Sequence, residues 1–159
     1  MNLFLIRHSI AERPSPSKSD LNRELTSEGI NLILKSSKFL KMFVPDLELI
    51  LSSPYIRAFQ TAEIISNSFD NKVKLIKENN LAAGCSTSSL IEVISCYDEQ
   101  NIAVVGHQPD ISNHISNLTS NGNVNLVFRP ATIAKIIFES RIGYGRGILE
   151  ILIPSEVII

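Results

Sequence analysis

The strongest constraint on the fold comes from short apolar runs that contain no polar residue and stop abruptly. Residues 102–105 read Ile-Ala-Val-Val and are closed by Gly106, and residues 3–6 read Leu-Phe-Leu-Ile and stop at Arg7. Runs of this length without alternation are typical of strands that are buried on both faces of a parallel sheet. The chain is therefore predicted to fold around such a sheet, with other elements covering it.

Helical patterns alternate with these runs. A loop rich in serine and proline, residues 9–25, follows the first run, and Thr26 is placed to cap a helix that ends before Pro45. Ser53 and Pro54 are expected to cap and begin a second helix that runs to about residue 69. Further helices are predicted over 87–97 and from Pro109 onward, and further strands over 47–51, 73–76, 125–128, 133–139 and 147–153, with a hairpin turn at 143–147.

Strands that alternate with helices up to about residue 120 predict an α/β fold. We expect a three-layer sandwich with a mostly parallel central sheet and helices on both faces. The length of 159 residues and the hydrophobic content of 44% suit a single domain that spans residues 1–159. Sheets of this kind bind ligands beyond the carboxyl ends of their strands, so functional residues are expected there.

Charge and composition exclude several classes of partner. Fifteen Lys and Arg against sixteen Asp and Glu leave a net charge of -1, which gives no general attraction to nucleic acid or to an anionic membrane. No apolar run approaches the roughly 20 residues that span a bilayer. Cys85 and Cys96 lack metal-binding spacing and are predicted to be free thiols. We expect a soluble cytoplasmic protein, and the sequence does not specify its oligomeric state.

Polar residues cluster at three predicted strand ends. Arg7 and His8 follow the first strand, Arg57 lies just beyond the second, and His107 follows the strand that ends at Gly106. If these strands are neighbours, two arginines and two histidines converge beside the N-terminus of a helix. Such a group of donors is suited to an anion, above all to a phosphoryl group.

The chemistry of these side chains gives each a role in phosphoryl transfer. A neutral imidazole is a competent nucleophile, and nearby guanidinium groups lower its pKa, which fits His8. Arginine forks grip the oxygens of a transferring phosphoryl group, which fits Arg7 and Arg57. A protonated His107 is expected to donate a further hydrogen bond to the same oxygens.

At this point the chain resembles a known family. The segments 7–8, 53–61 and 106–109, which read Arg-His, Ser-Pro-Tyr-Ile-Arg-Ala-Phe-Gln-Thr and Gly-His-Gln-Pro, resemble the histidine phosphatase superfamily, and residues 23–29 resemble an element of its short SixA-like branch. The resemblance implies a phosphoglycerate-mutase-like fold and a catalytic quartet of Arg7, His8, Arg57 and His107. It also implies that no metal or organic cofactor is needed and that the partner is a phosphohistidine-bearing protein or a small phosphoester.

The chain departs from this family at several positions. Ser9, a candidate phosphate-binding residue, follows His8 where glycine is usual, and we expect backbone strain there if the position needs a positive φ. Asn80 stands where relatives commonly have an acid, which leaves Glu78 and Glu12 as candidate general acids. Arg23 has two equal interpretations: it reaches the substrate, or it pairs with an acid of its own loop.

Three functions are therefore compared. The first is a phosphohistidine phosphatase that acts on a phosphorylated protein through a phospho-His8 intermediate. The second is a phosphatase of small phosphomonoesters, and the third is a non-catalytic module that binds phosphoproteins, suggested by Ser9 and Asn80. A metal site of His8, His107 and His114 is disfavoured because two arginines would repel a cation, and His114 is interpreted as structural.

Overall fold

The computed structural model describes residues 1–158 and places a six-stranded sheet at the centre of the protein. The strand order is β3-β2-β4-β1-β5-β6, with parallel pairing from β3 to β1 and antiparallel pairing of β5 and β6 at one edge. The strands are β1 (Asn2–Arg7), β2 (Leu49–Ser52), β3 (Lys74–Lys77), β4 (Asn101–Gly106), β5 (Ile133–Ile137) and β6 (Ile148–Ile153). The mostly parallel sheet predicted from the apolar runs is confirmed.

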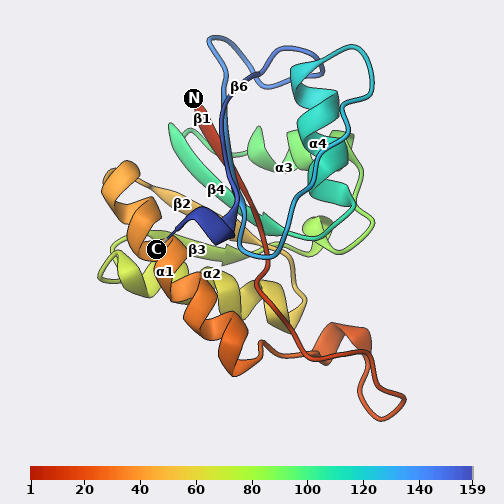
Figure 1. Ribbon diagram of the computed structural model, residues 1–159. Helices are drawn as coiled ribbons and strands as arrows, with labels where there is room; N and C mark the ends of the chain where they lie inside the picture. The colour runs from red at the N-terminus through yellow and green to blue at the C-terminus, as the bar shows by residue number, and fades with distance from the viewer. Residues whose placement is uncertain (159) are drawn as a thin grey trace.

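Helices cover both faces of this sheet (Figure 1). They are α1 (Ser27–Phe43), α2 (Ile56–Ser68), α3 (Thr87–Ile94) and α4 (Asp110–Thr119), with short 3-10 helices η1 (Asp20–Asn22), η2 (Asn79–Leu81) and η3 (Ser155–Val157). Within β1, Leu3 and Leu5 pack in the core beneath α3 and α4, whereas Phe4 and Ile6 pack in the core beneath α1 and α2. The continuous apolar run is thus explained by burial on both faces.

The start of α1 fixes the long loop that follows β1. The Thr26 hydroxyl accepts a hydrogen bond from Gly29 N at 3.0 Å, so Thr26 caps the helix as predicted. A Cβ atom at Gly29 would lie 2.0 Å from the Ile10 carbonyl oxygen. Only glycine permits the loop backbone to approach the helix this closely.

The loop itself projects from the body, carries η1 and contains two isolated β-bridges (Figure 1). Ala11 pairs with Leu25 at its base, and Lys18 Nζ binds the carboxylates of Glu12 and Glu24 at 2.6 and 2.7 Å. At the same base, Leu25 N–H donates to Gln60 Oε1 of α2 at 2.8 Å. The loop is therefore attached to both α1 and α2.

Several predicted boundaries are wrong. Residues 125–128 form no strand, and Phe128 instead buries its side chain in the core. Helix α2 begins at Ile56 with Tyr55 as its N-cap, and the Ser53 hydroxyl lies 2.7 Å from His107 Nε2. Helix α3 ends at Ile94, and the β5–β6 connection spans 138–147 rather than a tight turn at 143–147.

Candidate active site

The three polar junctions meet at one edge of the sheet. Strand β4 lies between β1 and β2, with Gly106 opposite Arg7 and Val105 opposite Ser52. Because the three strands are parallel, the residues that follow them emerge at the same carboxyl edge. The predicted convergence of two arginines and two histidines is what the structure shows.

His8 presents one ring nitrogen to this site. Its Nδ1–H donates to the Ser9 carbonyl oxygen at 2.7 Å, which leaves the lone pair on Nε2, where Arg57 Nε–H donates at 3.1 Å. The pKa of His8 is lowered to about 4, chiefly by burial and also by the charges of Arg57 and Arg7, against the Ser9 hydrogen bond, which raises it. Burial thus contributes more than the guanidinium groups named from the sequence. His8 is neutral at physiological pH, as a nucleophile requires.

Arg57 is buried in the first turn of α2 and has two donor edges in use. Its side edge, Nε and Nη2, faces His8 Nε2 and His107 Nδ1 at 3.1 and 3.4 Å. Its outer edge, Nη1 and Nη2, binds the Asp20 backbone oxygen at 2.6 Å and Asp20 Oδ2 at 3.0 Å. The edge that faces the histidines has the geometry to hold two phosphoryl oxygens.

His107 is neutral in this structure, so the protonated donor predicted from the sequence stays a prediction for the complex with a phosphoryl group. The pKa of His107 is lowered to about 3, chiefly by burial and also by neighbouring His8 and Arg57. Because Arg57 Nη2 donates to its Nδ1, the proton is on Nε2, which donates to Ser53 Oγ at 2.7 Å. A bound phosphoryl anion would offset the neighbouring positive charges and so raise the pKa of His107.

Arg7 brings a second guanidinium to the same edge. Its Nη1 donates to the Phe128 carbonyl oxygen at 2.9 Å. Its Nε is buried and has no hydrogen-bond partner among residues 1–158. Burial also lowers the pKa of Arg7. A buried donor without a partner is costly, so an anion at this edge would be stabilised by it.

Ser9 does not have the backbone strain expected of it. Among the described residues, the non-glycine positions with positive φ are Asp70, Asn71 and Ala131, and Ser9 is not one of them. Its side chain is fully buried and donates to the Gly29 carbonyl oxygen at 2.6 Å, and its N–H donates to Thr61 Oγ1 at 3.1 Å. Ser9 therefore fixes the backbone next to His8 between α1 and α2.

Asp20 is a residue of the site that the sequence did not reveal. Besides its contacts with Arg57, its Oδ1 accepts a hydrogen bond from Arg23 Nη1 at 2.6 Å. Arg23 thus pairs with an acid of its own loop, one of its two interpretations, and its Nε donates to the Glu12 carbonyl oxygen. An acid three residues before Arg23 was the available signal, but only the fold of the loop brings it to Arg57.

The two candidate general acids, Glu12 and Glu78, make their hydrogen bonds with residues outside the quartet. Glu12 binds Lys18 and accepts a hydrogen bond from Glu24 N–H. Glu78 accepts one from Asn80 N–H at the start of η2, and both of these residues line a hollow of about 350 Å³ against α3. Of the described residues that line this hollow, none belongs to the quartet of Arg7, His8, Arg57 and His107.

His114 belongs to a separate cluster. It is buried, its Nδ1 lies 3.0 Å from Thr87 Oγ1, and its Nε2 lies 3.5 Å from the thiol of Cys85. Cys85 and Cys96 are both free thiols. No group of three or more His, Cys, Asp or Glu within residues 1–158 is placed to hold a metal ion. Independence from metal stays a prediction for solution experiments.

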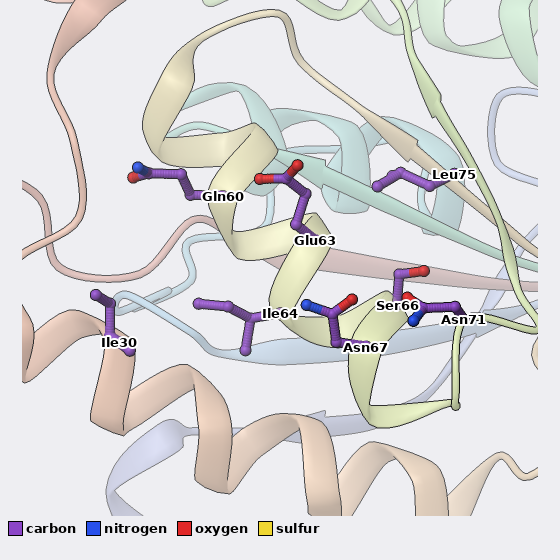
Figure 2. Close-up of a pocket in the computed structure, with 8 residues that line it drawn as sticks. All are labelled: Ile30, Gln60, Glu63, Ile64, Ser66, Asn67, Asn71 and Leu75. Atoms are coloured by element: carbon purple, nitrogen blue, oxygen red, sulfur yellow. The ribbon is translucent and has the colours of Figure 1, made fainter.

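A hollow between α1 and α2 is distinct from the active site (Figure 2). It measures about 560 Å³, and Figure 2 shows Ile30 of α1 and Gln60, Glu63 and Ile64 of α2 around it. The described residues that line it include neither arginine nor histidine. Its described lining has no cationic donor for a phosphoryl group, but its Gln60 anchors the loop that carries Asp20.

The buried histidines predict a loss of stability in acid. Burial lowers the pKa of His114 to about 4 from an ordinary value of 6.5. The unfolded chain therefore binds a proton as pH falls through 6.5 while the folded protein does not, and the stability cost reaches roughly 3 kcal/mol per histidine near pH 4. Urea unfolding at stepped pH should show the free energy of unfolding falling in this window. His114→Asn should have a shallower slope, and an unchanged slope would contradict the assignment.

Comparison with known proteins agrees with this geometry. The family model of the histidine phosphatase superfamily (branch 1) matches residues 3–82. A phosphohistidine phosphatase SixA homolog of Haemophilus influenzae is 30% identical over 150 residues, which cover 87% of this chain and 89% of that protein.

Solved structures share the fold. The protein histidine phosphatase SixA complexed with tungstate has a TM-score of 0.85 at 20% identity, covering 98% of this chain and 97% of that one. Phosphoserine phosphatase of Entamoeba histolytica, in complex with 3-phosphoglyceric acid, has a TM-score of 0.70 at 17% identity and 99% coverage of both chains. From the family model, which spans half the chain, and the relative in H. influenzae, the chain belongs to the histidine phosphatase superfamily.

Proposed function

We propose that this protein is a phosphohistidine phosphatase that dephosphorylates another protein through a phosphorylated His8. The observation that carries the proposal is the neutral Nε2 lone pair of His8, which faces the side edge of Arg57 with His107 at the same edge. A nucleophile and oxyanion donors around one small volume are the two requirements of phosphoryl transfer.

The reaction has two steps. His8 Nε2 forms a bond to phosphorus while the phosphorus–nitrogen bond of the substrate histidine breaks, and the leaving imidazole takes a proton from water. Water then attacks phosphorus, loses its proton to solvent and releases inorganic phosphate, and the electron pair of the breaking bond returns to Nε2. The Ser9 carbonyl oxygen holds the Nδ1 proton throughout, so the ring stays in the tautomer that the chemistry needs.

The charged donors stabilise the phosphoryl group as its bonds loosen. Arg57 offers Nε and Nη2, and Arg7 offers its buried Nε, which has no partner among the described residues. As the anion enters, the pKa of His107 rises, and its Nδ1 gains a proton that it donates to a phosphoryl oxygen. His107 is thus expected to be neutral in the free enzyme and charged in the complex.

A protein substrate is favoured over a small one by the relative in H. influenzae, a SixA homolog that covers 87% of this chain. The second candidate, hydrolysis of small phosphomonoesters, is supported by the shared fold of the E. histolytica phosphoserine phosphatase. The third candidate, a non-catalytic binding module, loses one of its two arguments because Ser9 is unstrained.

We place the reaction in the cytoplasm, where the free thiols Cys85 and Cys96 would stay reduced. Within the described residues, no helix has the length and apolar character to cross a bilayer.

The proposal is tested by turnover on a histidine-phosphorylated protein. With substrate in large excess over enzyme, inorganic phosphate should be released over many turnovers, and a chelator such as EDTA should leave the rate unchanged. Tungstate should inhibit competitively, because it resembles the phosphoryl group. Retention of the phosphoprotein without phosphate release would instead identify a binding module, and a requirement for added metal would contradict the mechanism.

A further inference from the structure

The projecting loop places a single carboxylate on the catalytic arginine. Asp20 lies in η1, and its backbone oxygen and Oδ2 accept hydrogen bonds from Arg57 Nη1 and Nη2 at 2.6 and 3.0 Å. The Arg57 side chain is 6% exposed, whereas that of Asp20 is 54% exposed. Asp20 thus reaches from the surface to a group that is otherwise buried.

Two positions are open to a carboxylate beside a guanidinium group, and they have opposite consequences. On the side edge, Asp20 would occupy the donors that face His8 and would compete with a phosphoryl group. Asp20 is instead on the outer edge, while Nε and Nη2 face His8 Nε2 and His107 Nδ1. The donors for the phosphoryl group are therefore left in place.

We infer that Asp20 is a positioning residue, which holds Arg57 by its outer edge so that the side edge stays directed at the phosphoryl group on His8. This inference rests on the proposed function. Because both outer nitrogens are bound by the same residue, the guanidinium plane cannot rotate about its long side chain without breaking two hydrogen bonds. Fixed donors stabilise the transition state without having to reorient during the reaction.

The charge of Arg57 gives a second reason for an acid at this place. Arg57 is the second residue of α2, where a cation opposes the positive end of the helix dipole. Asp20 offsets this charge on the side away from His8. Although burial raises the pKa of Asp20, the hydrogen bonds from Arg23 and Arg57 lower it overall, so the carboxylate is ionised at neutral pH.

Asp20 is itself held by the loop. Arg23 binds its Oδ1 at 2.6 Å and donates from Nε to the Glu12 carbonyl oxygen at 2.8 Å. Lys18 forms ion pairs with both Glu12 and Glu24 of the loop, and Gln60 accepts a hydrogen bond from Leu25 N–H at the end of the loop. These contacts fix the position of the loop between the two helices and Arg57.

The test compares Asp20→Asn and Asp20→Ala with a matched control, Asp70→Asn. Asp70 is also an exposed acid, 67% exposed, in an ion pair of 3.0 Å with Lys41, but it lies outside the site. Both Asp20 variants should lower kcat and kcat/KM together by about 10- to 100-fold, because a misdirected donor is lost chiefly in the transition state. The tungstate affinity of both Asp20 variants should fall as well. Asp70→Asn should change neither turnover nor tungstate affinity, and its melting temperature should match that of Asp20→Asn.

A double-mutant cycle with Arg57→Ala then decides the inference. If Asp20 acts through Arg57, Asp20→Ala should have no further effect on kcat or tungstate affinity once Arg57 is alanine. Independent, multiplying effects would overturn the inference, as would Asp20 variants with unchanged or raised activity, which would identify a blocking residue. Failure of the proposed function would be distinguishable from failure of this inference. In that case the wild-type protein itself would release no phosphate from phosphohistidine.

Discussion

Replacing His8 by alanine is expected to abolish the phosphoenzyme and to lower turnover by at least about 10⁴-fold. The wild-type protein, quenched during turnover of radiolabelled substrate, should carry a label that is labile in acid and stable in alkali, as a phosphorus–nitrogen bond is. The reason is structural: the lone pair of His8 Nε2, the proposed nucleophile, faces the Arg57 side edge, and its tautomer is fixed by the Ser9 carbonyl oxygen. Without the imidazole, no nucleophile remains at the place to which the donors of Arg57 direct the phosphoryl group.

His114→Asn is the control for this experiment. His114 is 3% exposed and its pKa is lowered to about 4 by burial, much as for His8, but it lies in the cluster with Thr87 and Cys85. The control protein should therefore keep the label on His8. Label that survives in His8→Ala would remove His8 from its role as nucleophile, whatever the effect on turnover.

Much of the fold could be predicted because strands that are buried on both faces have continuous apolar sequences. Leu3–Ile6 and Ile102–Val105 are continuous apolar runs since each has a helical layer on both sides. The parallel order then brings Arg7 and Gly106 opposite each other, which is why His8 and His107 were expected at one edge. Residues 125–128 were predicted wrongly because local β propensity carries no information on whether a strand edge is still free.

The rest of the site depends on contacts between distant segments. Asp20 meets Arg57, 37 residues away, only because Gly29 permits the loop to close on α1 and Gln60 holds its base. The strain expected at Ser9 was inferred from a family pattern, whereas Ser9 has no positive φ and is held by hydrogen bonds to Gly29 and Thr61. The neutral state of His107 follows from burial, which a sequence position does not specify.

The last expected result concerns the leaving group. An alkyl phosphate must expel a strongly basic alkoxide, and a positioned acid typically contributes about 10²- to 10⁴-fold to such a step. Asn80 cannot donate a proton of this kind, Glu12 is bound to Lys18, and Glu78 accepts a hydrogen bond at η2. Asp20 is in contact with Arg57 of the site, but hydrogen bonds from Arg23 and Arg57 lower its pKa and keep it ionised.

Phosphohistidine needs less help, because its imidazole can be protonated by water and leaves as a neutral group from a weak bond. We therefore expect fast turnover of phosphohistidine, slower turnover of aryl phosphates with acidic phenols, and turnover of simple alkyl phosphates about 10²- to 10⁴-fold below that of phosphohistidine. The measurement is kcat/KM for each class with one enzyme preparation, together with Glu78→Gln and Glu12→Gln. If either glutamate supplies a proton, its variant should slow alkyl phosphates selectively. Equal rates for alkyl phosphates and phosphohistidine, unchanged in both variants, would refute the leaving-group argument and the preference for a phosphohistidine substrate together.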